Sequence, residues 1–125
     1  MRTTPWEIAV DLRSWPSNGL TYEADYNLRA KRLSAPEVIG KFPFEGAWCA
    51  VAPGQTSTAH AHHEREIFFF FGGTGTVRVG DEAEPVAYGD EVHIRPGVEH
   101  EVTNDGADDL VYLSIWFPTG EATPA

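Results

Sequence analysis

The sequence is poor in cysteine and in basic residues. Cys49 is its single cysteine, so no disulfide can form within the chain, and stability must come from packing and from any bound metal. Nine lysines and arginines stand against 19 aspartates and glutamates, which gives a formal net charge of -10. That charge repels a phosphate backbone and an anionic membrane surface, so we expect neither nucleic acid nor membrane as a partner.

Long hydrophobic runs are also missing. No segment approaches the roughly 20 apolar residues needed to cross a bilayer, and the start has no apolar stretch of signal-peptide length. We therefore expect a cytoplasmic protein. A chain of 125 residues is long enough for one domain with its own core and too short for two, so we expect one site per chain.

Short apolar runs separated by glycine, proline, asparagine and aspartate favour an all-β, mostly antiparallel fold. The range 22–33 suits a strand or a short amphipathic helix, and we favour the strand. A single helical turn is expected at 34–39, capped by Ser34 and ended by Gly40. The predicted strands are 6–12, 22–33, 48–52, 58–62, 66–71, 76–79, 91–94, 99–103 and 110–117.

Two turn sequences and the chain ends complete this description. Gly80-Asp81 and Asn104-Asp105-Gly106 predict hairpin turns. We expect residues 1–44 to form N-terminal strands and a helical turn that pack on a barrel core at 45–118, followed by a frayed tail at 119–125. No linker-like segment separates these parts, so we expect a single domain overall.

Four side chains have the pattern of a metal site. His60 and His62 are two apart, so in an extended segment they project from the same face. Glu66 follows after three residues, and a tight turn can bring its carboxylate beside them. His100, on a later strand, can close the site. Three imidazoles and one carboxylate suit one divalent ion, and the ligand set alone does not choose the metal. We expect zinc or iron, with manganese, nickel or copper as alternatives.

The spacing of these ligands resembles the two motifs of the cupin superfamily. The first motif is matched by Gly54, five residues, His60-x-His62, three residues, Glu66, six residues and Gly73. The second is matched by Gly89-Asp90, Arg95-Pro96-Gly97, two residues, His100, three residues and Asn104. Arg95 stands where the family usually has proline. The resemblance covers about 48–117 and implies a double-stranded β-helix, or jelly roll, with the metal inside its wider mouth.

Aromatic residues near these motifs are candidates for the walls of a substrate pocket. Alternation along the strands puts two of them on the face of Glu66 and two on the mixed face of the last strand. The alternative for the last strand is an amphipathic strand with aromatics facing solvent. The five candidates are Trp48, Phe68, Phe70, Tyr112 and Trp116. His63 and His93 lie outside the family's ligand positions, and no role is assigned to them, to Cys49 or to any catalytic residue.

The resemblance implies a metal-dependent enzyme of small-molecule or secondary metabolism, whose substrate coordinates the ion. The reaction classes include oxygenases, isomerases and cyclases, and bond-forming rearrangements. A thiol dioxygenase is disfavoured, because those enzymes resemble three-histidine sites without the carboxylate that Glu66 supplies. The alternative is a non-catalytic cupin module that binds or senses a small ligand.

A fainter resemblance concerns partners. His62-His63-Glu64-x-Glu66 and Leu113-Ser114-Ile115-Trp116 resemble the zinc-binding cupin half of hydrazine synthetases, in which a methionyl-tRNA-synthetase-like ligase partner contributes to N–N bond formation. Such an activity would require a separate ligase protein. Cupins also commonly pair through their sheets, and the segment around Trp6 and Trp15 could supply a strand or an apolar patch, so we expect a homodimer.

Overall fold

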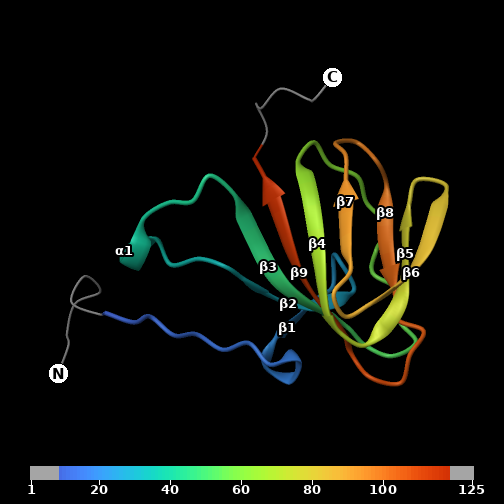
Figure 1. Cartoon of the computed structure of the whole chain (residues 1–125), viewed down its shortest axis with the longest axis horizontal. Coiled ribbons are helices and arrows are strands. Elements are labelled where there is room, and N and C mark those ends of the chain that lie inside the picture. The colour runs from blue at the N-terminus through green and yellow to red at the C-terminus, as the bar shows by residue number, and fades with distance from the viewer. Residues whose placement is uncertain (1–8, 119–125) are drawn as a thin grey trace.

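The computed structural model describes residues 9–118, and two antiparallel sheets dominate them (Figure 1). The larger sheet has the order β1-β2-β3-β9-β4-β7 and the smaller the order β6-β5-β8. This is the two-sheet architecture of a jelly roll, so the predicted all-β, mostly antiparallel fold is confirmed. The strands are β1 (Thr21–Glu23), β2 (Leu28–Arg32), β3 (Glu45–Val51), β4 (Arg65–Gly72), β5 (Thr74–Val79), β6 (Glu82–Ala87), β7 (Glu91–Ile94), β8 (His100–Thr103) and β9 (Leu110–Phe117).

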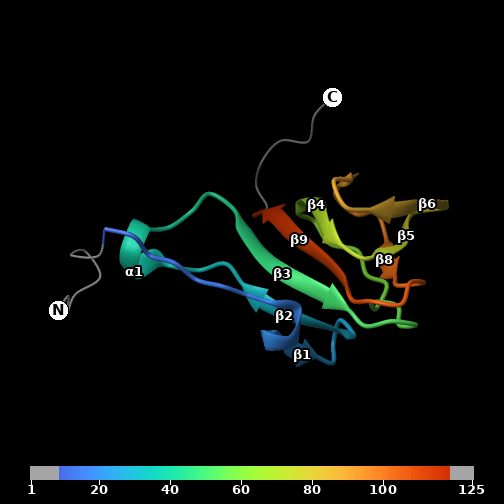
Figure 2. The ribbon, with the colours of Figure 1, turned by 60° about the horizontal axis from the view of Figure 1, so that its bottom comes forward.

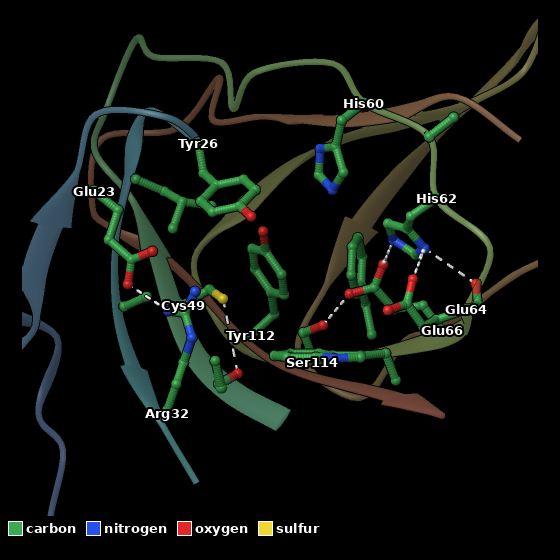
Figure 3. Close-up of a pocket in the computed structure, with 16 residues that line it drawn as sticks. Glu23, Tyr26, Arg32, Cys49, His60, His62, Glu64, Glu66, Tyr112 and Ser114 are labelled. Atoms are coloured by element: carbon green, nitrogen blue, oxygen red, sulfur yellow. Dashed lines mark hydrogen bonds and ion pairs between the residues drawn. The ribbon is translucent and has the colours of Figure 1, made fainter. Parts of the chain in front are cut away.

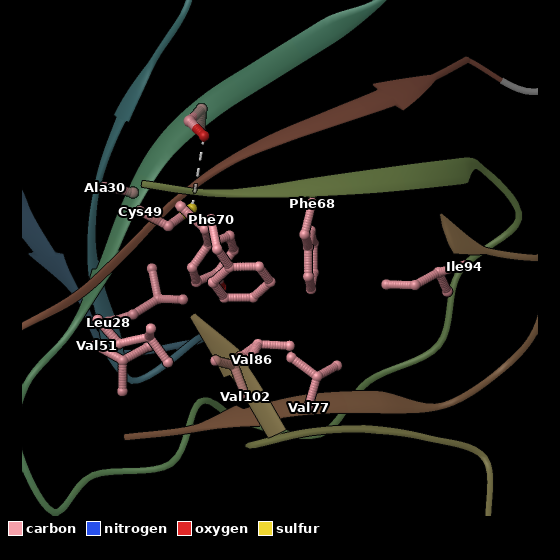
Figure 4. Close-up of a cluster of buried hydrophobic side chains, with 13 residues drawn as sticks. Leu28, Ala30, Cys49, Val51, Phe68, Phe70, Val77, Val86, Ile94 and Val102 are labelled. Carbon is pink, nitrogen blue, oxygen red and sulfur yellow. Dashed lines mark hydrogen bonds between the residues drawn. The ribbon is translucent and has the colours of Figure 1, made fainter. Parts of the chain in front are cut away.

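The core lies between the two sheets (Figure 4). The inner faces of β4 and β9 contribute Phe68, Phe70 and Tyr112, and the smaller sheet contributes Val77 and Val102; each is at most 3% exposed. Full burial of a large apolar side chain stabilises a fold by about 1.5–3 kcal/mol. These alternate positions therefore hold the sheets together and fix which face of each strand points inward.

Helical structure in the described residues is limited to short turns. A 3₁₀ turn spans Ser17–Gly19, and α1 spans Pro36–Ile39, where the sequence predicts a helical turn. Its N-cap is Ala35 without a side-chain hydrogen bond, so the predicted Ser34 cap is wrong, whereas Gly40 ends the turn at φ 79°. In the turned view α1 lies apart from both sheets (Figure 2). Among residues 9–118, no helix is long and apolar enough to cross a membrane.

The first predicted strand is not formed where the structure describes it. Residues 9–12 are not in a strand, and positions 6–8 lie outside the described residues. Val10 and Leu12 are 78% and 83% exposed, so their apolar side chains have no sheet to pack on. The predicted strand 22–33 is instead a hairpin of β1 and β2, because Asn27 adopts φ 52° and turns the chain.

The predicted strand 58–62 is also wrong. Its backbone makes a single bridge, His60 with His100, because the neighbouring bonds go to different partners. The Thr58 N–H donates to the Tyr26 carbonyl at 2.9 Å, whereas the Ser57 N–H donates to the Val102 carbonyl at 2.8 Å. The segment is therefore extended but cannot join a continuous ladder.

Two further differences concern turns. The Gly80-Asp81 hairpin is present, and it leads into β6, which the sequence did not predict because Pro85 interrupts the pattern; β6 is an edge strand, where proline is tolerated. Asn104-Asp105-Gly106 is not a hairpin turn, because β8 and β9 belong to different sheets. There the Gly106 N–H donates to Asn104 Oδ1 at 2.9 Å while the chain crosses between sheets.

Candidate metal centre

The predicted ligands His60, His62, Glu66 and His100 converge, and three of them, His60, His62 and Glu66, line one end of a cavity of about 400 Å³ (Figure 3). One potential ligand atom from each lies within 4.8 Å of every other. His60 and His62 lie on the connection between β3 and β4, Glu66 is the second residue of β4, and His100 begins β8. The fold thus brings together all four residues that the motif spacing selects.

Backbone hydrogen bonds hold these segments in place. The His60 N–H donates to the His100 carbonyl at 3.2 Å, and the His100 N–H donates to the His60 carbonyl at 3.0 Å. The Gly97 N–H donates to the His62 carbonyl at 2.7 Å. The centroids of the His60 and His100 rings are consequently 4.6 Å apart. The ligands are therefore positioned by the joining of a loop to a strand of the smaller sheet.

The three imidazoles are oriented by the same kind of contact. In each ring, Nδ1 lies at hydrogen-bonding distance from a backbone carbonyl two residues away, which assigns a proton to Nδ1 and makes Nε2 the nitrogen that a metal ion would use. The contacts are His60 with Thr58 at 3.0 Å, His62 with Glu64 at 3.1 Å, and His100 with Val98 at 2.9 Å.

Glu66 supplies the negative charge of the cluster. Its Oε1 lies 2.8 Å from His62 Nε2 and 3.2 Å from His100 Nε2, and the Ser114 hydroxyl donates to Oε2. Burial by itself raises the pKa of this carboxyl, but the contacts with His100 and Ser114 and the nearby His62 outweigh it and hold the pKa below its ordinary value. Glu66 is therefore an anion enclosed by imidazoles.

The buried Nε2 atom of His100 tests whether a metal fits. Among residues 9–118 it is the one buried side-chain nitrogen or oxygen without a hydrogen-bond partner, and His100 is 1% exposed. Its contact with Glu66 Oε1 is not aligned as a hydrogen bond. A buried ring nitrogen without a hydrogen-bond partner is unfavourable, and a cation between it and the carboxylate would satisfy both groups. The four residues therefore fit a divalent ion.

The cavity continues from the ligands along the inner face of the larger sheet. Phe68, Tyr112 and Trp116 line it, as the sequence predicts. Small side chains on β2 and β3, namely Ala30, Ala47 and Cys49, leave the space unfilled. Glu23 and Arg32 line the part away from the metal ligands, and Tyr26 lies between the two ends, with its ring centroid 5.5 Å from that of His60 (Figure 3).

The middle of the cavity is neutral. Burial raises the pKa of the Cys49 thiol to about 12, with a smaller contribution from the charge of Glu66. Burial likewise raises the pKa of the Tyr112 hydroxyl well above its ordinary value. Both groups stay protonated at physiological pH, so the thiol is not a reactive thiolate and the hydroxyl can donate a hydrogen bond.

Two predicted pocket residues lie elsewhere. Ala47 and Cys49 face the cavity, so alternation along the strand places Trp48 on the outer face. There its ring centroid lies 6.3 Å from that of Trp15 and 5.0 Å from that of Phe71. Phe70 is on the inner face but packs beside Tyr112 in the core, 2% exposed, without lining the cavity. The prediction that these two aromatics form pocket walls therefore has to be corrected.

The two histidines outside the cluster are exposed, and three cavity residues were not predicted from the sequence. His63 is exposed, and the His93 side chain is 69% exposed beside Glu91. Sequence reasoning missed Glu23, Tyr26 and Arg32, because they precede both motifs. The one available signal was the alternation in 28–32, which places Arg32 on the same face as the buried Leu28 and Ala30.

Two antiparallel sheets that enclose three histidines and a glutamate define a cupin-type barrel. A sequence model of the cupin domain family matches residues 47–116 of this chain. The chain belongs to the cupin domain family.

Similar solved structures support this family membership. A cupin 2 conserved barrel domain protein from Salinispora arenicola is 34% identical, over 90% of this chain and 92% of that one, with a TM-score of 0.77. The plu4264 protein from Photorhabdus luminescens is 32% identical, over 86% of this chain and 88% of that one, with a TM-score of 0.76. A putative sugar phosphate isomerase from Acidithiobacillus ferrooxidans is 28% identical, over 73% of this chain and 59% of that one, with a TM-score of 0.60.

Proposed function

We propose that this protein is a metal-dependent enzyme acting on a small molecule that coordinates one divalent ion inside the barrel. The supporting observation is the cluster of His60, His62, Glu66 and His100, in which Glu66 and His100 are buried and His60, His62 and Glu66 line a cavity of about 400 Å³. A bound ion would supply a Lewis acid or, in the case of iron, an activator of dioxygen. Four protein ligands leave further coordination positions for a substrate.

The chain's own groups define what happens around the ion. Ser114 holds the Glu66 carboxylate through a hydrogen bond, which fixes its orientation. The protonated Tyr112 hydroxyl can donate a hydrogen bond to a substrate oxygen or nitrogen. Phe68 and Trp116 give the cavity apolar walls, which exclude water from the reacting atoms. We assign substrate binding to Tyr112, Phe68 and Trp116.

The proposed activity belongs to small-molecule or secondary metabolism, as an oxygenase, an isomerase or cyclase, or a bond-forming rearrangement. The similarity to a protein named as a putative sugar phosphate isomerase supports keeping redox-neutral chemistry in this range. N–N bond formation in hydrazine synthesis stays within the proposal on the sequence resemblance, and it requires a separate ligase partner.

A homodimer is the proposed assembly. On the outer face of the larger sheet, Trp15, Trp48 and Phe71 form a continuous aromatic group, and Phe71 is 46% exposed. Trp6, the other residue of the expected patch, lies outside the described residues. Sedimentation velocity at several concentrations tests this proposal, because a concentration-independent monomer contradicts it.

The enzyme proposal is tested by turnover. Metal-loaded protein is incubated with a metabolite extract, and mass spectrometry follows which compounds disappear and which appear. We expect conversion by the wild type and by His93→Ala, a matched exposed histidine outside the cluster, and none by metal-free protein or His62→Ala. Conversion that survives without metal contradicts the proposal. A compound that binds and is recovered unchanged supports the alternative, a non-catalytic ligand-binding cupin.

A further inference from the structure

The cavity has a second polar end, away from the metal ligands (Figure 3). Glu23 of β1 and Arg32 of β2 form an ion pair there, in which the guanidinium Nη1 donates to Glu23 Oε2. Within the described residues, Arg32 is the sole lysine or arginine that lines the cavity, whereas Glu64 and Glu66 add negative charge near the metal ligands. Apart from a bound metal, Arg32 is thus the one fixed positive charge available to an anionic ligand.

The strand register places this arginine relative to the metal centre. Arg32 is opposite Ala47 on β3, and Ala47 is opposite Ser114 on β9. Neighbouring strands are about 4.8 Å apart, so Arg32 and Ser114 are about 10 Å apart across the sheet. Because the Ser114 hydroxyl contacts Glu66, this row runs from the ion pair to the metal centre.

The residues along the row leave room for a ligand. The intervening Ala47 carries only a methyl group, and the next row inward contains Ala30 and Cys49, which are also small. These positions form the floor of the cavity of about 400 Å³, within the usual size range of small-molecule sites. An elongated small molecule can therefore contact the metal centre and Arg32 at once.

The contacts of Arg32 leave it able to bind an anion. A guanidinium has five N–H donors. Among the described residues, Arg32 makes one hydrogen bond, to Glu23. The side chains of Arg32 and Glu23 are 47% and 28% exposed, so rearranging the ion pair requires little free energy. The planar fork of donors matches a carboxylate in bidentate geometry.

We propose that Arg32 binds a carboxylate at the far end of a substrate whose other end coordinates the metal. Glu23 acts as a positioning residue that holds the guanidinium over the cavity. This inference rests on the proposed function and narrows its substrate class to elongated small acids with a metal-chelating group at one end and a carboxylate at the other.

Paired probes test the inference by isothermal titration. 2-Oxoglutarate and 2-oxoadipate each carry a chelating 2-oxo acid and a distal carboxylate, whereas 2-oxopentanoate and 2-oxohexanoate have the same carbon chains ending in methyl. With metal-loaded wild type, we expect a carboxylate-ended probe to bind at least about tenfold tighter than its methyl-ended partner, as one charge-assisted contact provides. Arg32→Met should remove this preference without changing metal content or methyl-ended binding, and Arg32→Lys should retain part of it.

Lys31→Met is the matched control, because it removes the same charge from the neighbouring exposed position of β2, whose side chain points to the other face. It should keep the preference. Equal binding within both probe pairs, absence of binding by the carboxylate-ended probes, or a preference that survives in Arg32→Met overturns the inference. Metal content and the same titrations on metal-free protein separate the two proposals. A wild type that holds no metal contradicts the proposed function. An Arg32-dependent preference for the carboxylate-ended probes in metal-free protein still supports the subsite.

Discussion

The two ends of the cavity differ in origin and in burial. The metal end is built from residues inside the family match at 47–116, and two of its ligands, Glu66 and His100, are 7% and 1% exposed. The ion-pair end comes from β1 and β2, which precede the match, and its side chains are partly exposed. One end therefore lies inside the segment that the family model matches, and the other lies before it.

This difference has an energetic consequence. Buried ligands that lack a counter-cation destabilise the site, so the metal end should depend strongly on each side chain. The exposed ion pair is screened by water, so losing it should affect ligand selection more than folding. Substitutions at the two ends should separate these roles.

The largest effect is expected from removing a ligand. His100→Ala should lower zinc affinity by roughly a hundredfold or more, because it removes a directly coordinating nitrogen, whereas loss of an outer contact costs 10–100-fold. Competition with a chromophoric chelator measures the affinity. His93→Ala is the control and should bind as the wild type does. Equal affinity of the His100→Ala and His93→Ala variants would remove His100 from the site.

A smaller effect is expected one contact away from the metal. Ser114→Ala removes the hydroxyl that donates to Glu66 Oε2 and should weaken zinc binding by roughly 10–100-fold. Chelator competition again gives the number, and Ser114→Thr, which keeps a hydroxyl, should recover part of it. Unchanged affinity in Ser114→Ala would show that the buried carboxylate is oriented by the histidines alone.

The neutral middle of the cavity predicts a pH dependence. The pKa of Cys49 is about 12 in the fold against an ordinary 9.0, so the folded state holds the thiol proton more tightly. The resulting stabilisation is complete below pH 9 and is lost as the pH rises towards 12. Between pH 8.5 and 10.5 the free energy of unfolding in urea should fall by about 2 kcal/mol more than in Cys49→Ala, which has no thiol to titrate. Parallel pH profiles of the two proteins would contradict a buried neutral thiol.

The smallest effect on folding is expected at the ion pair. Glu23→Gln should reduce the free energy of unfolding by at most about 1 kcal/mol, because the paired side chains are partly exposed. Urea unfolding of the metal-free protein measures it. A loss of several kcal/mol would make the pair a structural element and erase the contrast between the two ends.

The sequence was sufficient to predict the metal end. His60 and His62 share a direction in any extended segment, so their convergence did not depend on the strand 58–62, which is absent. Glu66 and His100 were found because the motif spacing encodes which segments meet. The pairing of His60 with His100 that brings the sheets together is a long-range contact, and local pattern alone does not contain it.

The ion-pair end was beyond the sequence for a related reason. Glu23 and Arg32 meet because the Asn27 turn splits one expected strand into a hairpin, and the register of β2 on β3 then directs Arg32 to the cavity. Trp48 was misplaced because, after Glu45, its strand continues as GAWCAV, which is apolar or small on both faces, so alternation did not reveal which face is inside.

Elemental analysis of protein purified without chelator or added metal tests the central claim most directly, with Glu66→Ala and His100→Ala prepared in parallel. We expect close to one zinc or iron ion per wild-type chain and little metal in either variant. A wild type that contains no metal, and takes up none when incubated with zinc or iron(II), would contradict it.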